Sequence, residues 1–139
     1  MVKIEIKRLN DAFHMEALNE QGNRVQMDAS PDIGGEGKGM RPMQLLMVAL
    51  GGCSTIDVIN ILKKQKQDVK DIAITVTGER EGGAIPSLYR QAHVHFKLQG
   101  DLDPVKVEKA INLSMDKYCS VTKTLEKTAT ITHSYEIIR

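Results

Sequence analysis

The chain lacks the features that mark membrane-bound or nucleic-acid-binding proteins. It has no tryptophan, two phenylalanines and three tyrosines among 139 residues, and its formal net charge is only +1. No basic surplus points to nucleic acid, and no polybasic run points to anionic lipid. The longest apolar run, residues 45–50, is far shorter than the ~18 residues that a membrane span needs. We therefore expect neither a nucleic-acid partner nor a membrane partner.

The chain also has little cysteine, with two residues of this type. Residues 1–7 alternate charged and apolar side chains, unlike the apolar stretch of a signal peptide. Two cysteines in a reducing compartment rarely form a permanent disulfide. We expect a cytoplasmic protein with one domain over residues 1–139, whose core relies on aliphatic side chains and seven methionines.

The N-terminal part alternates as strands do, over residues 2–9, 12–19 and 24–28. Turn residues separate these segments, so the pattern predicts a three-stranded antiparallel meander. Residues 29–41 are rich in glycine. The phosphate-loop pattern is absent there, because Gly39 rather than serine or threonine follows Lys38. We interpret this segment as a surface loop.

A helix is predicted from Pro42 to about Leu62, since proline favours the first helical position. The segment is apolar on nearly every side, and Gly51-Gly52 predicts a break or kink. A helix that is apolar all round has to be buried all round. A chain of this size could hardly cover it, so we expect a second subunit to do so.

The C-terminal part predicts strands over residues 72–80 and 88–99, a helix opened by Asp103 and Pro104, a short helix after Cys119 and a strand over residues 129–138. The order β-β-β-α-β-β-α-α-β keeps strands and helices apart, which indicates the α+β class. The first of these helices has an apolar stripe formed by Val107, Ala110, Ile111, Met115 and Tyr118.

The two cysteines share a local pattern, because serine follows each one and each is predicted at the start of a helix. Ser54 and Asp57 have the spacing of a capping box after the glycine break. A helix start favours the reactive thiolate of Cys53, whereas the negative charge of Asp57 favours the thiol. Spacing alone leaves open that Cys53 and Cys119 are merely buried small hydrophobes.

Three histidines are candidates for other chemistry. His93 and His95 share a polar strand face and could present two imidazoles to a metal, but no third ligand is in view. We interpret this face as solvated. His133 shares a face with Ile131 and Tyr135, which favours a hydrogen-bonded core histidine over a catalytic one. No zinc-type cysteine cluster or dinucleotide fingerprint is present, so we expect no metal and no cofactor.

Three segments together resemble the OsmC/Ohr family, and most closely its YhfA-like branch. They are residues 39–53, which end in Gly-Gly-Cys, residues 118–121 (Tyr-Cys-Ser-Val) and residues 131–136 (Ile-Thr-His-Ser-Tyr-Glu). The resemblance covers nearly the whole chain. It implies the OsmC-like fold, with antiparallel sheets and a long buried central helix. It also implies an intertwined homodimer with the central helices packed back to back and active sites at the interface.

The resemblance further implies thiol-dependent reduction of organic hydroperoxides. Cys53 would attack the peroxide and become a sulfenic acid, Cys119 would condense with it, and a cellular dithiol would reduce the disulfide. The peroxidase branches carry a glutamate ten residues before the first cysteine, paired with an arginine from the N-terminal sheet. Met43 occupies that position here, and Arg8 is the nearest arginine.

Two alternatives follow from the missing glutamate. One is a non-catalytic stress protein of the same family that senses redox state or binds a small molecule. The other is a structural dimer that makes no use of its cysteines.

Overall fold

The computed structural model describes all residues, 1–139. Its elements follow the predicted order β-β-β-α-β-β-α-α-β, which confirms the α+β class. The chain forms two compact units, Met1–Leu46 and Met47–Arg139. That residues 1–139 constitute one domain stays a prediction.

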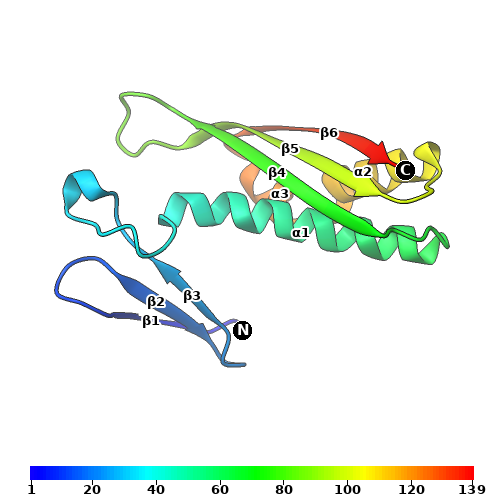
Figure 1. Cartoon of the computed structure of the whole chain (residues 1–139). Helices are drawn as coiled ribbons and strands as arrows, with labels where there is room; N and C mark the ends of the chain where they lie inside the picture. Colours follow the sequence, from blue (N-terminus) through cyan, green and yellow to red (C-terminus); the bar gives the residue numbers. More distant parts are fainter. The chain divides into compact units, whose positions relative to one another are not determined.

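The N-terminal unit contains the predicted antiparallel meander (Figure 1). Strand β1 (Ile4–Arg8) pairs with β2 (Met15–Asn19), which pairs with β3 (Arg24–Met27). Asn10 forms the first turn, because its side-chain oxygen accepts the N–H groups of Ala12 and His14. The three strands are confirmed. Strand β1 is shorter than predicted at both ends, β2 at its start and β3 at its end, by one to three residues in each case.

The glycine-rich loop of this unit folds around its own carboxylate. Asp28 is 1% exposed, and its two oxygens accept the backbone N–H groups of Ala29, Glu36 and Lys38 at 2.7, 3.1 and 3.2 Å. Burial acts to raise the pKa of Asp28, but these N–H groups outweigh burial and leave the pKa lowered. The loop thus directs backbone N–H groups at an internal anion.

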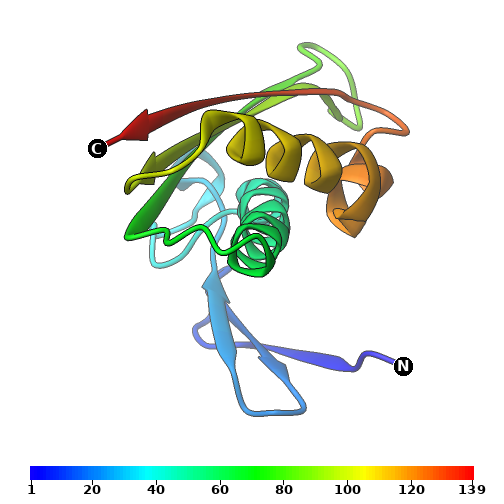
Figure 2. The same ribbon diagram turned by 90° about the vertical axis from the view of Figure 1, so that its right-hand side faces the viewer.

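The C-terminal unit is a three-stranded sheet with helices on one face (Figure 2). The long helix α1 (Pro42–Lys64) begins in the N-terminal unit, and its residues 47–64 belong to the C-terminal unit. Strand β5 lies between β4, which is antiparallel to it, and β6, which is parallel to it. The bounds of the remaining elements are β4 (Asp71–Arg80), β5 (Tyr89–Gln99), α2 (Pro104–Leu113), α3 (Ser120–Leu125) and β6 (Thr130–Ile138).

The core of this unit joins α1, β5 and α2. Helix α2 begins as predicted, with the Asp103 side chain accepting the Val105 N–H at 3.0 Å. In β5 the alternate side chains Ala92, Val94, Phe96 and Leu98 are buried, and so is Tyr89 at the start of the strand, whereas the side chains between Ala92 and Leu98 are partly or fully exposed. The core side chains of the three elements are Leu50, Val58, Leu62, Ala92, Val94, Phe96, Leu98, Val107, Ala110 and Ile111.

Helix α1 is continuous through its two glycines, so the predicted break is wrong. A Cβ atom on Gly51 would lie 2.8 Å from Val76 Cγ2, whereas one on Gly52 would have nothing within 4 Å. Gly51 therefore lets the helix approach β4 closely. The predicted capping box is also wrong, because the hydroxyls of Ser54 and Thr55 donate back to carbonyls of the same helix.

Helix α1 is buried along one side only. Its buried residues Leu50, Ser54, Val58 and Leu62 follow a four-residue spacing. Helix α1 is long and apolar enough to cross a membrane, judged by length and composition only. Of its most apolar stretch, 33% is buried. The sequence-based argument, which considered uninterrupted runs alone, did not detect this. One such helix is weak evidence for a span, because core helices of soluble proteins share these properties.

The stripe predicted on α2 is confirmed except at its end. Val107, Ala110, Ile111 and Met115 are buried, but Tyr118 is 50% exposed. A π-helical turn, η2 (Ser114–Tyr118), follows α2. The wider turn changes the helical phase, so a position counted at ordinary helical spacing no longer faces the core.

Candidate functional site

The candidate site combines two cysteines and a carboxylate. Cys53 Sγ, Cys119 Sγ and a carboxylate oxygen of Asp57 all lie within 4.8 Å of one another. Cys53 and Asp57 are one turn apart on α1, and Cys119 comes from the start of α3. Both cysteines are free, and their sulfurs are not at the ~2 Å of a disulfide. The expected meeting of two distant cysteines is therefore seen, while their catalytic role stays a prediction.

Cys53 lies in the interior of α1, not at a helix start as predicted. The backbone N–H groups around it are part of a continuous helix from Pro42 to Lys64. Unpaired N–H groups occur only in the first turn of a helix, so they are not available to this sulfur. Cys53 is partly exposed, which leaves it accessible to a reagent.

Cys119 has the position that the sequence predicts, since it caps the N-terminus of α3. Its side chain is fully buried, and its sulfur accepts the Thr122 N–H at 3.4 Å. Burial raises the pKa of the Cys119 thiol, hydrogen bonds from Thr122 oppose that rise, and the neighbouring Cys53 adds to it. The raised pKa keeps this thiol protonated at neutral pH.

A buried serine that sequence reasoning missed holds Asp57 in place. The Ser114 hydroxyl lies 3.0 Å from Asp57 Oδ2 and 3.2 Å from the Ser54 carbonyl oxygen. The Ser114 carbonyl in turn accepts the Cys119 N–H at 2.8 Å. Ser114 thus connects the two halves of the site, and because it lies 57 residues from Asp57, no local pattern could have revealed it. Thr122, by contrast, lies three residues after Cys119, the usual spacing for a helix cap.

His133 is not the hydrogen-bonded core histidine that we predicted. It is half-buried, and its buried Nε2 atom has no hydrogen-bond partner. Burial lowers the pKa of His133, Asp116 opposes this shift, and His93 adds to it. His133 and Thr122 both line a hollow of about 350 Å³, so the imidazole lies beside the segment that begins with Cys119.

The other two histidines occupy the opposite, polar face of the sheet, as expected. His93 is bonded to Thr132 Oγ1 at 2.6 Å and to Ser134 Oγ at 2.7 Å. His95 is bonded to the same Ser134 oxygen at 2.7 Å and to Glu136 at 2.8 Å. All four ring nitrogens therefore have partners, which agrees with the interpretation of a hydrated strand face.

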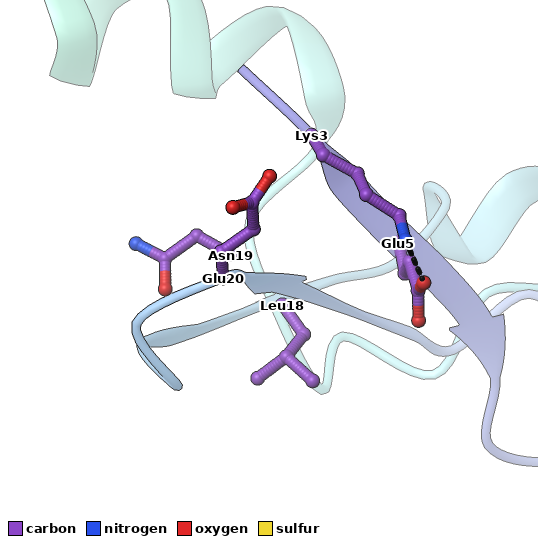
Figure 3. Close-up of a pocket in the computed structure, with 5 residues that line it drawn as sticks. All are labelled: Lys3, Glu5, Leu18, Asn19 and Glu20. Carbon is purple, nitrogen blue, oxygen red and sulfur yellow. Dashed lines mark ion pairs between the residues drawn. The ribbon is translucent and has the colours of Figure 1, made fainter. Parts of the chain in front are cut away.

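A hollow of about 410 Å³ in the N-terminal unit contains none of the cysteines or histidines discussed above (Figure 3). Five residues of the N-terminal unit line it: Lys3, Glu5, Leu18, Asn19 and Glu20. The ion pair of Lys3 and Glu5 at its edge has side chains 65% and 69% exposed. A hollow without a buried polar group or a nucleophile gives no reason to assign a function.

Comparisons with known proteins identify the family. A family model described as OsmC-like protein matches residues 35–134. Protein YhfA of Escherichia coli (strain K12) is 44% identical over 118 residues, which are 84% of each chain.

Solved structures agree with this relationship. A hypothetical protein from Aquifex aeolicus VF5 superposes with a TM-score of 0.84 at 31% identity, covering 99% of this chain and 96% of that one. An organic hydroperoxide resistance protein OsmC from Legionella pneumophila has a TM-score of 0.72 over 96% of both chains, and at 15% identity it is evidence for the fold alone. The chain therefore belongs to the OsmC-like protein family, as the resemblance of its cysteine segments predicted.

Proposed function

We propose that this protein reduces organic hydroperoxides through a two-cysteine thiol cycle. The observation that carries the proposal is the convergence of two free cysteines from distant segments to within 4.8 Å. Support also comes from the fold, which the chain shares with an organic hydroperoxide resistance protein. The substrate is a small hydroperoxide, and the reductant is a cellular dithiol.

The different surroundings of the two cysteines support distinct roles for them. The partly exposed Cys53 attacks the peroxide, so an S–O bond forms, the O–O bond breaks and the alcohol leaves with a proton. The buried Cys119 then attacks the sulfenic sulfur of Cys53, forming the disulfide and releasing water. A dithiol reduces this disulfide by exchange and becomes oxidised itself.

A second candidate function is redox sensing or small-molecule binding without turnover. It is favoured by Met43, which occupies the position of the glutamate in the peroxidase branches, and by Asp57, which adds negative charge beside the thiols. No lysine, arginine or histidine is among the groups that shift the pKa of Cys119. A buried thiol such as Cys119, whose pKa is raised and which no neighbouring cation activates, reacts slowly, which suits a slowly oxidised sensor.

Peroxide consumption separates the two functions. The reduced protein is mixed with cumene hydroperoxide or hydrogen peroxide, free thiols are counted, and peroxide loss is followed with dithiothreitol or lipoate as reductant. The proposal predicts loss of both thiols and continued turnover with the organic peroxide. Oxidation of the thiols without turnover supports the sensor, and inert thiols exclude both the peroxidase and the redox sensor and leave a binding or structural role.

Variants test the assigned roles. Cys53→Ser should abolish consumption, and Cys119→Ser should stop after one turnover with a sulfenic acid that a dimedone probe captures by mass spectrometry. The control is His93→Ala, which changes a side chain on the other face of the sheet and should leave turnover unchanged. Full activity of Cys53→Ser would show that the nucleophile is assigned wrongly.

The proposed assembly is an intertwined, cytoplasmic homodimer in which a second copy covers α1. Support comes from the large apolar side chains that α1 exposes: Leu46, Val48, Ile56 and Ile59 are 38%, 51%, 69% and 42% exposed. Water-exposed apolar area of this kind favours association. Light scattering of the wild-type protein should give twice the chain mass, and the Ile56→Glu variant should give the mass of a single chain. The matched control is Ile85→Glu, at a fully exposed position between β4 and β5.

A further inference from the structure

The candidate site gathers three ligand atoms of the types that bind thiophilic metals. Two sulfurs and a carboxylate oxygen lie within 4.8 Å of one another. Thiolate and carboxylate are both zinc ligands, with Zn–S bonds of ~2.3 Å and Zn–O bonds of ~2.1 Å. Two such sulfurs on one tetrahedral ion are about 3.8 Å apart. Side-chain rotations that move each atom by about 1 Å would therefore bring all three atoms within bonding distance of one metal ion.

The three groups are anchored on helices rather than on loops. Cys53 and Asp57 project from successive turns of α1, and Cys119 is fixed by the cap that it forms on α3. The Ser114 hydroxyl 3.0 Å from Asp57 Oδ2 holds the carboxylate beside the sulfurs. Such hydrogen bonds to a ligand orient it and strengthen metal binding.

The charge of the site is also suited to a cation. Two thiolates and a carboxylate would place three negative charges within 4.8 Å of one another. Like charges this close together, one of them on a fully buried side chain, are unfavourable without a counter-charge. A divalent cation supplies the missing charge.

We propose that the reduced protein binds one thiophilic divalent cation of the zinc class through Cys53, Cys119 and Asp57. On binding, the two thiols lose their protons to solvent, the hydrated ion releases bound waters, and two metal–sulfur bonds and one metal–oxygen bond form in their place. Three protein ligands leave the fourth position open to water, which is typical of an exchangeable site rather than a structural one. The bound metal occupies both sulfurs and therefore blocks their oxidation.

The site contrasts with the two histidines on the sheet. His93 and His95 engage all their ring nitrogens with Thr132, Ser134 and Glu136. No third ligand atom joins them in a group comparable to that of the cysteines. The histidine pair thus provides a matched control for adventitious binding by surface imidazoles.

Cobalt titration tests the proposal. Adding Co²⁺ to the full-length reduced protein should produce one equivalent of thiolate-to-cobalt charge-transfer absorption, which Zn²⁺ should remove by competition. Mg²⁺ at the same concentration should leave the band intact, because thiolates select against it. Oxidation of the wild-type chain with diamide should abolish the band, and a phosphine reductant should restore it, with no substitution needed.

Variants assign the ligands. Cys53→Ser and Cys119→Ser should each weaken zinc affinity by about 100-fold or more, and Asp57→Asn by roughly 10-fold. The double variant His93→Ala/His95→Ala should bind as the wild type does. Circular dichroism confirms that each variant is folded.

Two results would overturn the metal site: no charge-transfer band in the fully reduced protein, or a band that survives both cysteine substitutions. Metal binding does not require peroxide turnover. A band without turnover leaves the metal site standing and excludes the peroxidase, whereas turnover without a band does the reverse.

Discussion

The segments around Cys53 and Cys119 begin alike in sequence and differ in structure. Each has serine after the cysteine, yet Cys53 lies within 23 residues of continuous helix while Cys119 caps a helix of six residues. The first sulfur is partly exposed, and the second is fully buried. The comparison teaches that helix packing, rather than the shared Cys-Ser pair, determines what each thiol can do.

The largest expected difference between the two segments is in chemical reactivity. With iodoacetamide at neutral pH, Cys53 should react roughly 100-fold faster than Cys119, because burial both shields the second thiol and raises its pKa. Peptide mass spectrometry of samples quenched at intervals gives both rates in one experiment. In urea the two rates should converge, and equal rates in the folded protein would refute the difference in environment.

The two glycines before Cys53 provide a sharper test of its helix. Gly51→Ala should lower the free energy of unfolding by about 1–3 kcal/mol, because the new methyl group would meet Val76 at 2.8 Å. Gly52→Ala is the matched control within one chain; in the Ile56→Glu background, which should be monomeric, it should raise the free energy of unfolding by about 1 kcal/mol, since alanine favours a helix interior. Urea unfolding measures both. A loss of stability when Gly52→Ala is made in the wild-type chain would instead indicate that this exposed position contacts another subunit.

Much of this fold could be predicted because its signals are local. Alternation located the strands, and Asp103 with Pro104 located the start of α2. The error at Gly51-Gly52 has a physical cause, since glycine serves both helix breaks and close packing, and only the position of Val76 decides between them. The π-helical turn that exposes Tyr118 likewise has no local signal.

The candidate site was predictable in part. Its cysteines were identified by family resemblance, and Asp57 by its place one turn after Cys53. Ser114 could not be found, because its contact with Asp57 depends on how α2 and η2 pack against α1. The unpartnered Nε2 of His133 also depends on tertiary structure, since alternation predicts burial but not a hydrogen-bond partner.

Replacing each cysteine by alanine should change the stability of the protein differently, because Cys119 caps a helix and Cys53 lies in a helix interior. Cys119→Ala removes the acceptor of the Thr122 N–H and should cost about 1 kcal/mol of stability. Cys53→Ala should change stability by less than about 0.5 kcal/mol, because alanine is a good helix former at a partly exposed site. Cys119→Ser retains an acceptor and serves as the control. Equal losses at both positions in thermal unfolding would contradict the capping role.

The smallest expected effect is a pH dependence that belongs to Cys119 alone. Because its pKa is raised above the ordinary value of 9.0, the folded chain holds the thiol proton more tightly than the unfolded chain does. The resulting stability is complete below that value and is lost as pH rises through the folded pKa. With reductant and chelator present, urea unfolding up to about pH 10 should show this loss in Cys53→Ser but not in Cys119→Ser. If Cys119→Ser showed the same pH dependence of stability, the titrating group would be another residue, and burial of Cys119 would not be the cause.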